Sequence, residues 1–124
     1  MSVTKKTKRK LINNYVDGWK RNNLELIVST LSQDCIIIES HGPMYKGVNE
    51  IKSWVKEWIE AGSYVTKWGI TSFYFIKDIA FFEWNFKCLL SGNKHELDGI
   101  SIVKFKNNKI SYIREYRTTK PKVA

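Results

Sequence analysis

The hydrophobic pattern changes its period once along the chain, from the spacing of helices to the alternation of strands. Apolar residues recur every three or four positions in three early segments, which predicts helices over 8–21, over 24–31, and up to Gly62. From Tyr64 onward apolar and polar residues alternate, which predicts four long strands joined by short hairpin turns. These strands cover residues 64–77, 79–91, 94–106 and 109–117.

Between the second and third helices lies a short β-branched run. Residues 35–39, with the sequence Cys-Ile-Ile-Ile-Glu, are typical of a strand that is buried on both faces. Residues 40–47 are rich in turn formers and are predicted to form a loop. Helices followed by an antiparallel meander predict an α+β domain, in which one face of the sheet covers the helices.

The strand over residues 94–106 differs from its neighbours because it is apolar on both faces. Leu97, Val103 and Phe105 occupy one face, and Ile100 and Ile102 occupy the other. An apolar face that no helix covers favours burial against a partner. We therefore expect a homodimer that forms through the sheet face bearing Ile100 and Ile102.

Composition changes this picture in a few respects. The chain has 124 residues, of which 43% are hydrophobic and 14% aromatic, so it fits one folded domain and not a disordered chain. Its uncharged apolar runs are too short for a membrane span, and its N-terminus lacks the apolar core of a secretory signal. Cys35 and Cys88 fit neither a disulfide framework nor a zinc site. We expect a protein of the reducing cytoplasm.

The net charge of +9 is concentrated at the two ends of the chain. Residues 1–10 contain five basic side chains and residues 118–124 contain two, whereas residues 11–117 contain 14 basic and 12 acidic ones. We interpret these segments as a basic flexible arm, a short basic tail and a single domain, respectively. The arm either solubilises the protein or binds phosphate groups. Because the aromatic residues do not interleave with Lys and Arg, the sequence argues against a base-stacking surface for nucleic acid.

Several polar side chains fall on positions that the pattern predicts to be buried. Tyr15 lies on the apolar stripe of the first helix, Glu39 ends the β-branched run, and Ser101 shares a strand face with apolar residues. Glu115 is in phase with Ile113 on the last strand. A carboxyl group in an apolar pocket has a raised pKa and suits a general base, and a facing tyrosine suits an oxyanion donor. The structural alternative is a solvated or ion-paired Glu39 and a Tyr15 bonded to a carbonyl group.

Other residues are candidates for the lining of a ligand cavity. His41 and Tyr45 follow Glu39 in the loop and are placed to line the mouth of a cavity. The aromatic residues of the third helix and of the strand over 79–91 either belong to the hydrophobic core or line an apolar ligand cavity. The candidate ligand-binding residues are Trp19, His41, Tyr45, Trp54, Trp58, Trp84, Phe86, Ile113 and Glu115. No spacing typical of metal ligands, phosphate-binding loops or nucleophile elbows occurs. We therefore expect neither a metal nor a cofactor.

The order helix, helix, strand, loop, helix and meander resembles the nuclear transport factor 2-like superfamily, and within it the SnoaL-like and ketosteroid-isomerase-like branch. The resemblance spans about residues 8–117. It rests on residues 22–28, 31–35, 45–47, 97–103 and 108–110, together with Ile51 and Trp54. It implies a cone-shaped, strongly curved antiparallel sheet wrapped over three N-terminal helices, as in nuclear transport factor 2-like and cystatin-like rolls.

The resemblance also implies roles for three residues. Counted from Asp34, the catalytic acid–base position of the steroid-isomerase pattern falls on Glu39, and the oxyanion tyrosine falls on Tyr15. The second oxyanion donor, a protonated aspartate in the pattern, falls on Ser101, which argues against steroid isomerisation as such. Two functions stay open. One is cofactor-free acid–base chemistry of isomerase, cyclase or dehydratase type on a small, mostly apolar molecule, and the other is a non-catalytic ligand-binding or dimeric interaction module.

Overall fold

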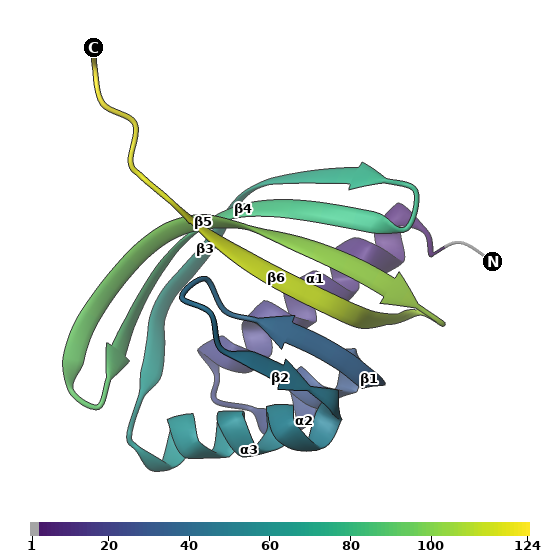
Figure 1. The fold of residues 1–124 in the computed structure, drawn as a ribbon, viewed down its shortest axis with the longest axis horizontal. Coiled ribbons are helices and arrows are strands. Elements are labelled where there is room, and N and C mark those ends of the chain that lie inside the picture. The colour runs from purple at the N-terminus through teal and green to yellow at the C-terminus, as the bar shows by residue number, and fades with distance from the viewer. Residues whose placement is uncertain (1–2) are drawn as a thin grey trace.

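The computed structural model describes residues 3–124 and shows three helices packed against one face of a curved six-stranded sheet (Figure 1). The helices are α1 (Lys5–Lys20), α2 (Leu24–Ser29) and α3 (Gly47–Glu60). The strands are β1 (Leu31–Ile38), β2 (Met44–Lys46), β3 (Tyr64–Ile76), β4 (Ile79–Leu90), β5 (Asn93–Lys106) and β6 (Lys109–Thr118). The predicted α+β architecture, with helices covered by a curved sheet, is confirmed.

Local sequence signals place the ends of the first two helices. The Thr4 side chain caps α1 by accepting a hydrogen bond from the backbone N–H of Thr7, and the Asn23 side chain caps α2 in the same way through Leu26. Between the two helices Asn22 adopts a φ of 50°, a left-handed conformation that Asn tolerates better than most residues. No helix within residues 3–124 combines the length and the apolar character needed to cross a membrane.

Helix α1 starts earlier than predicted. Residues 5–7, which precede the predicted helix over 8–21, form its first turn, and residues 8–10, the end of the expected flexible arm, continue it; residues 1–2 of that arm lie outside the described residues. Lys8 is 3% exposed, and its ammonium group donates a hydrogen bond to the backbone carbonyl of Lys77 in the β3–β4 turn. The Arg9 guanidinium lies over aromatic rings of β3. The prediction was wrong for these residues because long basic side chains can pack their aliphatic stems on the domain.

The strand order is β2-β1-β6-β5-β4-β3, and every neighbouring pair except β1 and β6 is antiparallel. The four C-terminal strands form the predicted meander. The sheet as a whole is mixed rather than antiparallel, because β1 pairs in parallel with the last strand. Strand β1 begins at Leu31, before the predicted residues 35–39, and the segment predicted as a loop contains the short strand β2. The early start of β1 arises from its pairing with β6, which is distant in the sequence, whereas β2 is a three-residue strand in a local hairpin with β1 and is too short to show an alternating pattern.

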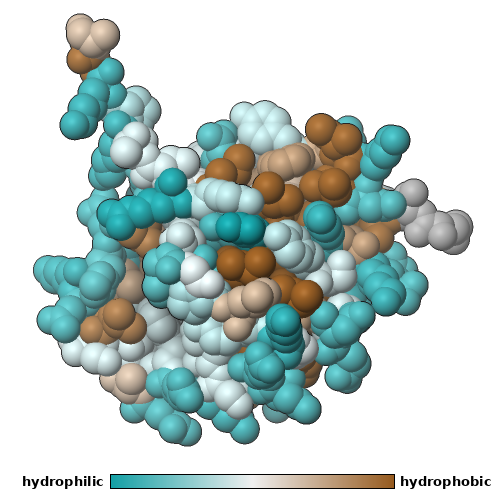
Figure 2. All heavy atoms as spheres, in the orientation of Figure 1, coloured by the Kyte–Doolittle hydropathy of each residue, from teal (hydrophilic) through white to brown (hydrophobic). Residues whose placement is uncertain are grey.

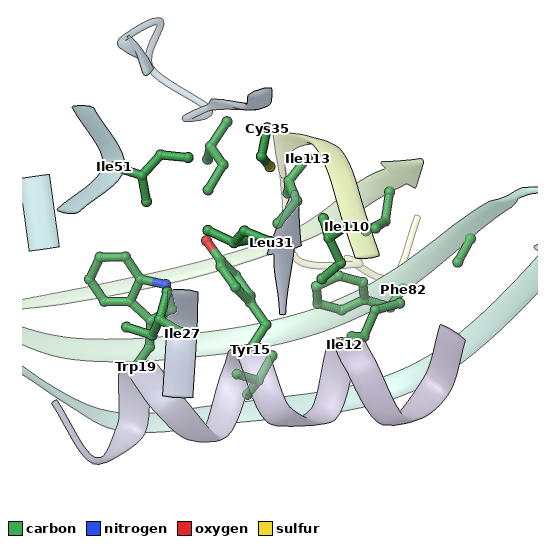
Figure 3. Packing of buried hydrophobic residues seen from close by; sticks show 14 of the residues in the cluster. Ile12, Tyr15, Trp19, Ile27, Leu31, Cys35, Ile51, Phe82, Ile110 and Ile113 are labelled. Atoms are coloured by element: carbon green, nitrogen blue, oxygen red, sulfur yellow. The ribbon is translucent and has the colours of Figure 1, made fainter. Parts of the chain in front are cut away.

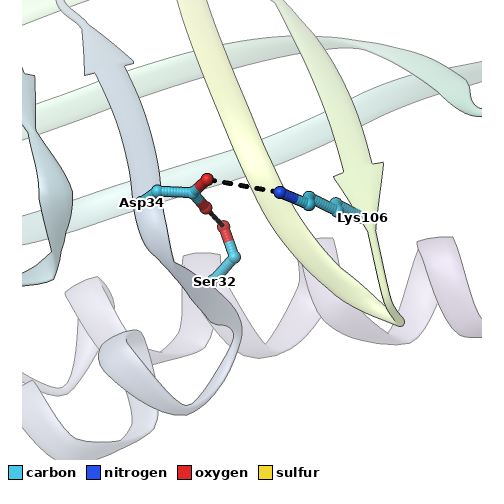
Figure 4. Close-up of polar contacts among 3 residues, drawn as sticks. All are labelled: Ser32, Asp34 and Lys106. Atoms are coloured by element: carbon cyan, nitrogen blue, oxygen red, sulfur yellow. Dashed lines mark hydrogen bonds and ion pairs between the residues drawn. The ribbon is translucent and has the colours of Figure 1, made fainter.

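The first half of β1 is irregular. Its register with β6 shifts between Leu31 and Ile36. In this stretch Asp34 accepts a hydrogen bond from Ser32 Oγ at 3.0 Å, and it lies 3.4 Å from the ammonium group of Lys106 on β5 (Figure 4). The Ser32 hydrogen bond and then the Lys106 charge hold the pKa of Asp34 below its usual value. Because Asp34 and Lys106 are exposed, we expect little stability from this ion pair.

The hydrophobic core lies between the helices and the concave face of the sheet. Figure 3 shows Ile12, Tyr15 and Trp19 of α1 pointing toward residues of the sheet and of α3. Along β4 the predicted alternation is present, since Phe82 is 1% and Trp84 5% exposed, with an exposed residue between them. This alternation decides which side chains of β4, β5 and β6 face the helices.

Candidate functional site

Strand register brings two carboxyl groups together on the concave face. β1 and β6 run parallel, with Ile37 opposite Ile113, and both side chains are at most 1% exposed. Two positions further along each segment, and therefore on the same face, are Glu39 and Glu115. In each segment the inward-facing apolar residues are thus followed by a glutamate. Because the strands are parallel and in register, the two glutamates lie side by side.

These carboxyl groups line a cavity between the helices and the sheet, with a volume of about 70 Å³. Its walls are six aromatic side chains and two carboxyl groups, from Tyr15, Trp19, Trp54, Trp58, Trp68, Phe86, Glu39 and Glu115. Among the described residues no Lys, Arg or His lines it. Sites for drug-sized ligands measure roughly 300–1,000 Å³, so this cavity is several-fold smaller and excludes a polycyclic ligand.

Helix periodicity places most of the aromatic walls. Tyr15 and Trp19 are one turn apart on α1, and Trp54 and Trp58 are one turn apart on α3, so each pair projects from one helix face. The Trp19 ring contacts both tryptophans of α3, with centroid distances of 4.8 Å to Trp54 and 5.8 Å to Trp58. The two helices thereby close one side of the cavity with interlocked rings.

Trp68 on β3 is a wall residue that the sequence analysis missed. Its ring centroid lies 6.1 Å from that of Tyr15 and 5.3 Å from that of Phe86, its partner in the β3–β4 register. The hairpin pairing with Phe86 is the signal that could have identified it. A register shift between Val65 and Lys67 interrupts the alternation of β3. Because of this interruption, the two-residue period of the strand does not predict that Trp68 faces inward.

Tyr15 is the central polar residue of α1. It is 2% exposed, and its hydroxyl group points away from the helix into the interior (Figure 3). Burial, reinforced by the nearby charge of Glu115, raises the pKa of Tyr15 well above its usual value. The phenol therefore stays protonated over the physiological range and is available as a hydrogen-bond donor.

Glu39 stands at the mouth of the cavity and contacts the loop that follows β1. The Tyr45 hydroxyl donates a hydrogen bond to Glu39 Oε2 at 3.2 Å, and His41 Nε2 lies 3.5 Å from the same oxygen. Tyr45 in turn stacks on Trp54 with a centroid distance of 4.2 Å. Burial raises the pKa of Glu39, while His41 and the Tyr45 hydrogen bond act in the opposite direction. The His41 side chain is 72% exposed, so Glu39 connects the cavity with solvent.

Glu115 is the more strongly perturbed of the two acids. Burial, and then the negative charge of Glu39, raise its pKa to about 8. At neutral pH Glu115 is therefore mainly a neutral acid that can donate a hydrogen bond, and Glu39 is the member of the pair that ionises first. The cavity thus contains a proton acceptor beside two proton donors, Glu115 and Tyr15.

Five predicted site residues lie outside the cavity wall: His41 and Tyr45, which contact Glu39, and also Ser101, Trp84 and Ile113. The indole N–H of Trp84 donates a hydrogen bond to Ser101 Oγ at 2.9 Å, and both side chains are buried. Gly99 makes room for this indole, because a Cβ at that position would lie 2.5 Å from a ring carbon of Trp84. Ile113 belongs to the hydrophobic core. The structure therefore gives Ser101 the task of orienting Trp84 rather than a place at the cavity.

The described residues contain no group of three His, Cys, Asp or Glu side chains arranged to hold a metal ion. Cys35 and Cys88 are separate buried thiols, and burial raises the pKa of both, to about 12 for Cys35. Neither is a thiolate at neutral pH. The chemistry available to Glu39, Glu115 and Tyr15 is proton transfer and hydrogen bonding.

Comparisons with known proteins agree with this architecture. Residues 12–113 match the family model of the SnoaL-like domain. No match was found among curated proteins. The solved structure of a LEH-like epoxide hydrolase from M. tuberculosis superposes with a TM-score of 0.81 at 7% identity, covering 91% of this chain and 84% of that chain.

Two further solved structures are similar. A cystatin-like protein of unknown function from Methylobium petroleophilum has a TM-score of 0.76 at 18% identity, covering 98% of this chain and 82% of its own. A protein with a ketosteroid isomerase-like fold from Catenulispora acidiphila, solved in complex with trimethylamine, has a TM-score of 0.72 at 15% identity, covering 86% and 83%. At these identities the likeness concerns the fold. The predicted resemblance to the SnoaL-like and ketosteroid-isomerase-like branch is confirmed.

Proposed function

Because the chain belongs to the family of SnoaL-like domains, we propose that it binds a small, mostly apolar molecule in the aromatic cavity and moves a proton on it without a cofactor. Glu39 is the base that removes a proton from a carbon next to a carbonyl group. Tyr15 donates a hydrogen bond to the carbonyl oxygen, which gains negative charge as the carbon–hydrogen bond breaks. Glu39 then returns the proton to another carbon, so the carboxylate is regenerated.

One observation carries this proposal, the meeting of Glu39, Glu115 and Tyr15 in a single aromatic chamber. Burial raises the pKa values of both acids, and a carboxyl group with a raised pKa is a stronger base than an exposed one. Protonated Glu115 places a neutral donor beside the base, so a ligand oxygen can be held without a full positive charge. The reaction class is that of isomerases, cyclases and dehydratases that act through an enolate.

Exchange of hydrogen for deuterium tests the proposal without knowledge of the natural substrate. Small cyclic ketones are incubated in D₂O with the protein, and loss of the α-proton signal is followed by NMR. We expect Glu39→Gln to slow the protein-dependent exchange by about 10²-fold or more, and Tyr15→Phe by about 10-fold to 10²-fold. Glu60→Gln, a change of the same type on an exposed residue of α3, is the matched control. Equal exchange rates in wild type and Glu39→Gln would contradict the proposal.

A second candidate function is non-catalytic binding of a small alkylammonium ion. The cavity combines six aromatic rings with two carboxyl groups and has no basic side chain among its described lining residues, a composition that suits cation–π recognition. The similar protein from Catenulispora acidiphila was solved with trimethylamine. Titration with trimethylammonium chloride, followed by tryptophan fluorescence, separates the candidates. This second function requires saturable binding that weakens in Glu39→Gln and no exchange of ketone protons.

We also propose that the protein is a homodimer, formed through the outer face of the sheet that bears Ile100 and Ile102. Register places Ile102 next to Phe81, and Phe81 next to Tyr74, which is 53% exposed. Figure 2 shows hydrophobic residues gathered over the strands of the sheet. In sedimentation equilibrium we expect twice the monomer mass for wild type and the monomer mass for Ile102→Lys. A wild-type monomer at micromolar concentration would overturn this assignment.

A further inference from the structure

Two indole N–H groups at the cavity have no hydrogen-bond partner within the described structure. They belong to Trp19 and Trp68, which are 5% and 6% exposed and both line the cavity. The Trp19 indole lies near enough to the Tyr15 hydroxyl to lower the pKa of Tyr15, but without the geometry of a hydrogen bond, and Trp68 has no such neighbour among residues 3–124. Two other indoles are paired, because Trp58 donates to Asn22 Oδ1 at 3.2 Å and Trp84 donates to a serine. Buried polar groups are nearly always paired, so two exceptions in one cavity indicate that something absent from the chain itself accepts these hydrogen bonds.

The rings of Trp19 and Trp68 both pack against the Tyr15 ring. The Tyr15 ring centroid lies 6.5 Å from that of Trp19 and 6.1 Å from that of Trp68, and both ring pairs are T-shaped. Figure 3 shows the Trp19 nitrogen and the Tyr15 oxygen on the same side of α1, both inside the molecule. Three donor side chains from two elements, α1 and β3, therefore line the same cavity as the carboxyl groups of Glu39 and Glu115, whose charges act on the Tyr15 hydroxyl.

We propose that Trp19 and Trp68, together with Tyr15, hold an oxygen atom of the ligand, which makes a small carbonyl compound or phenol the class of molecule bound. An indole N–H only donates, and it keeps its proton beside a buried acid. A ligand oxygen with two lone pairs can accept from several donors at once. This assignment rests on the function proposed above and deepens it.

The assignment also supplies a second hydrogen-bond donor in place of Ser101, which the resemblance to steroid isomerases led us to expect. Ser101 accepts the Trp84 hydrogen bond and lies outside the cavity wall. Trp68 is the neighbour of Trp84, with a centroid distance of 6.4 Å, and it reaches the cavity that Ser101 does not. The donor role that the steroid-isomerase pattern gives to an acid on β5 is thereby moved to an indole on β3. An alkylammonium ion has no acceptor atom and would leave both indoles unpaired.

The test compares two probes of nearly equal size, phenol and toluene, of which only phenol has an oxygen atom. Trp68 is replaced by β-(3-benzothienyl)alanine, which keeps the ring shape and carries sulfur in place of N–H. The same replacement at Trp84 is the matched control, because Trp84 lies outside the cavity wall and its N–H donates to Ser101. Dissociation constants are measured by ligand-observed NMR, and circular dichroism verifies folding.

We expect wild type to prefer phenol, and the Trp68 isostere to lose about five- to tenfold of that preference while toluene binding is unchanged. A Trp19 isostere should lose a similar factor, and the Trp84 isostere should lose none. An unchanged phenol-to-toluene ratio in both the Trp68 and Trp19 isosteres would overturn the inference. If wild type binds neither probe, the inference and the proposed cavity function fall together. If the preference depends on Trp68 but Glu39→Gln exchanges ketone protons normally, only the catalytic proposal fails.

Discussion

The two ends of the concave sheet face obey the same alternation but differ in what they enclose. At one end Ile12, Phe82 and Ile110 pack into a core in which each side chain is at most 1% exposed. At the other end the inward positions hold Glu39 and Glu115, and the surrounding rings leave a cavity of about 70 Å³.

The difference lies in the side chains that the helices offer. Branched aliphatic groups interdigitate and fill space, whereas T-shaped contacts between large rigid rings, such as Trp19 with Trp58, leave gaps that no small group fills. The two-residue period of a strand decides only that a side chain points toward the helices. Whether that side chain lies in a densely packed core or beside a cavity depends on the helix side chains that it faces.

The largest expected effect on stability comes from a truncation at the densely packed end of the concave face. Phe82→Ala removes a ring that is 1% exposed, and we expect the free energy of unfolding to fall by about 3–5 kcal/mol. Phe86→Ala, at the cavity end of the same strand, removes a half-buried ring beside existing free space and should cost clearly less. Urea denaturation of both variants measures the contrast. Equal losses would show that the two ends are packed alike.

Next in size is the pH dependence of the cavity end. Burial keeps the proton on Glu115 in the folded state up to about pH 8, whereas the unfolded chain releases it near pH 4.5. Between these values the folded state binds more protons, so the free energy of unfolding falls as pH rises through this window. Glu115→Gln removes the effect. We expect the variant to match wild type at pH 4 and to exceed it by on the order of 2–4 kcal/mol at pH 9.

Thermal or urea unfolding of wild type and Glu115→Gln across pH 4–9 checks this sign. Glu60→Gln on α3 serves as the control, because that side chain is exposed and should leave the profile unchanged. A gap between Glu115→Gln and wild type that narrows as pH rises would mean that Glu115 is held as an anion.

A smaller effect separates a structural Ser101 from a catalytic one. Ser101→Ala leaves the buried Trp84 N–H without its acceptor, and we expect a loss of about 1–3 kcal/mol in the free energy of unfolding. Deuterium exchange of bound ketones should stay within about twofold of wild type, because the hydroxyl lies outside the cavity wall. The reverse pattern, slow exchange in a variant of normal stability, would show that Ser101 takes part in the reaction.

The smallest effect is expected at the surface, outside both ends of the concave face. Lys106→Met removes the partner of Asp34, and both side chains are exposed in the wild-type pair. We expect the Tm to remain within experimental error, because an exposed ion pair gains little over its hydrated state. Asp34→Asn should behave in the same way at neutral pH. A clear drop in Tm in both variants would show that the irregular start of β1 depends on this contact.

Much of the fold could be predicted because its signals are local. The helical stripes, the Asn23 cap and the hairpin turns act over a few residues, and the elements they predict are present within a few positions of their expected ends. The start of β1 and its parallel pairing with β6 were missed, since both depend on a strand distant in the sequence. Strand β2 was missed because its three residues, paired with β1 in a local hairpin, are too few to show an alternating pattern. Residues 5–10 were misjudged because charge alone does not show that a lysine such as Lys8 can bury its stem.

The same division applies to the candidate site. The sequence by itself determined that Tyr15, Glu39 and Glu115 face inward, because facing is set by periods of 3.6 and 2 residues along a single element. Only the tertiary structure decided that Trp68 lines the cavity and that Ser101 does not. The first outcome depends on a register shift in β3, and the second depends on the hydrogen bond from the Trp84 indole on β4 to Ser101 on β5. Such contacts between elements produce no periodic pattern in the sequence.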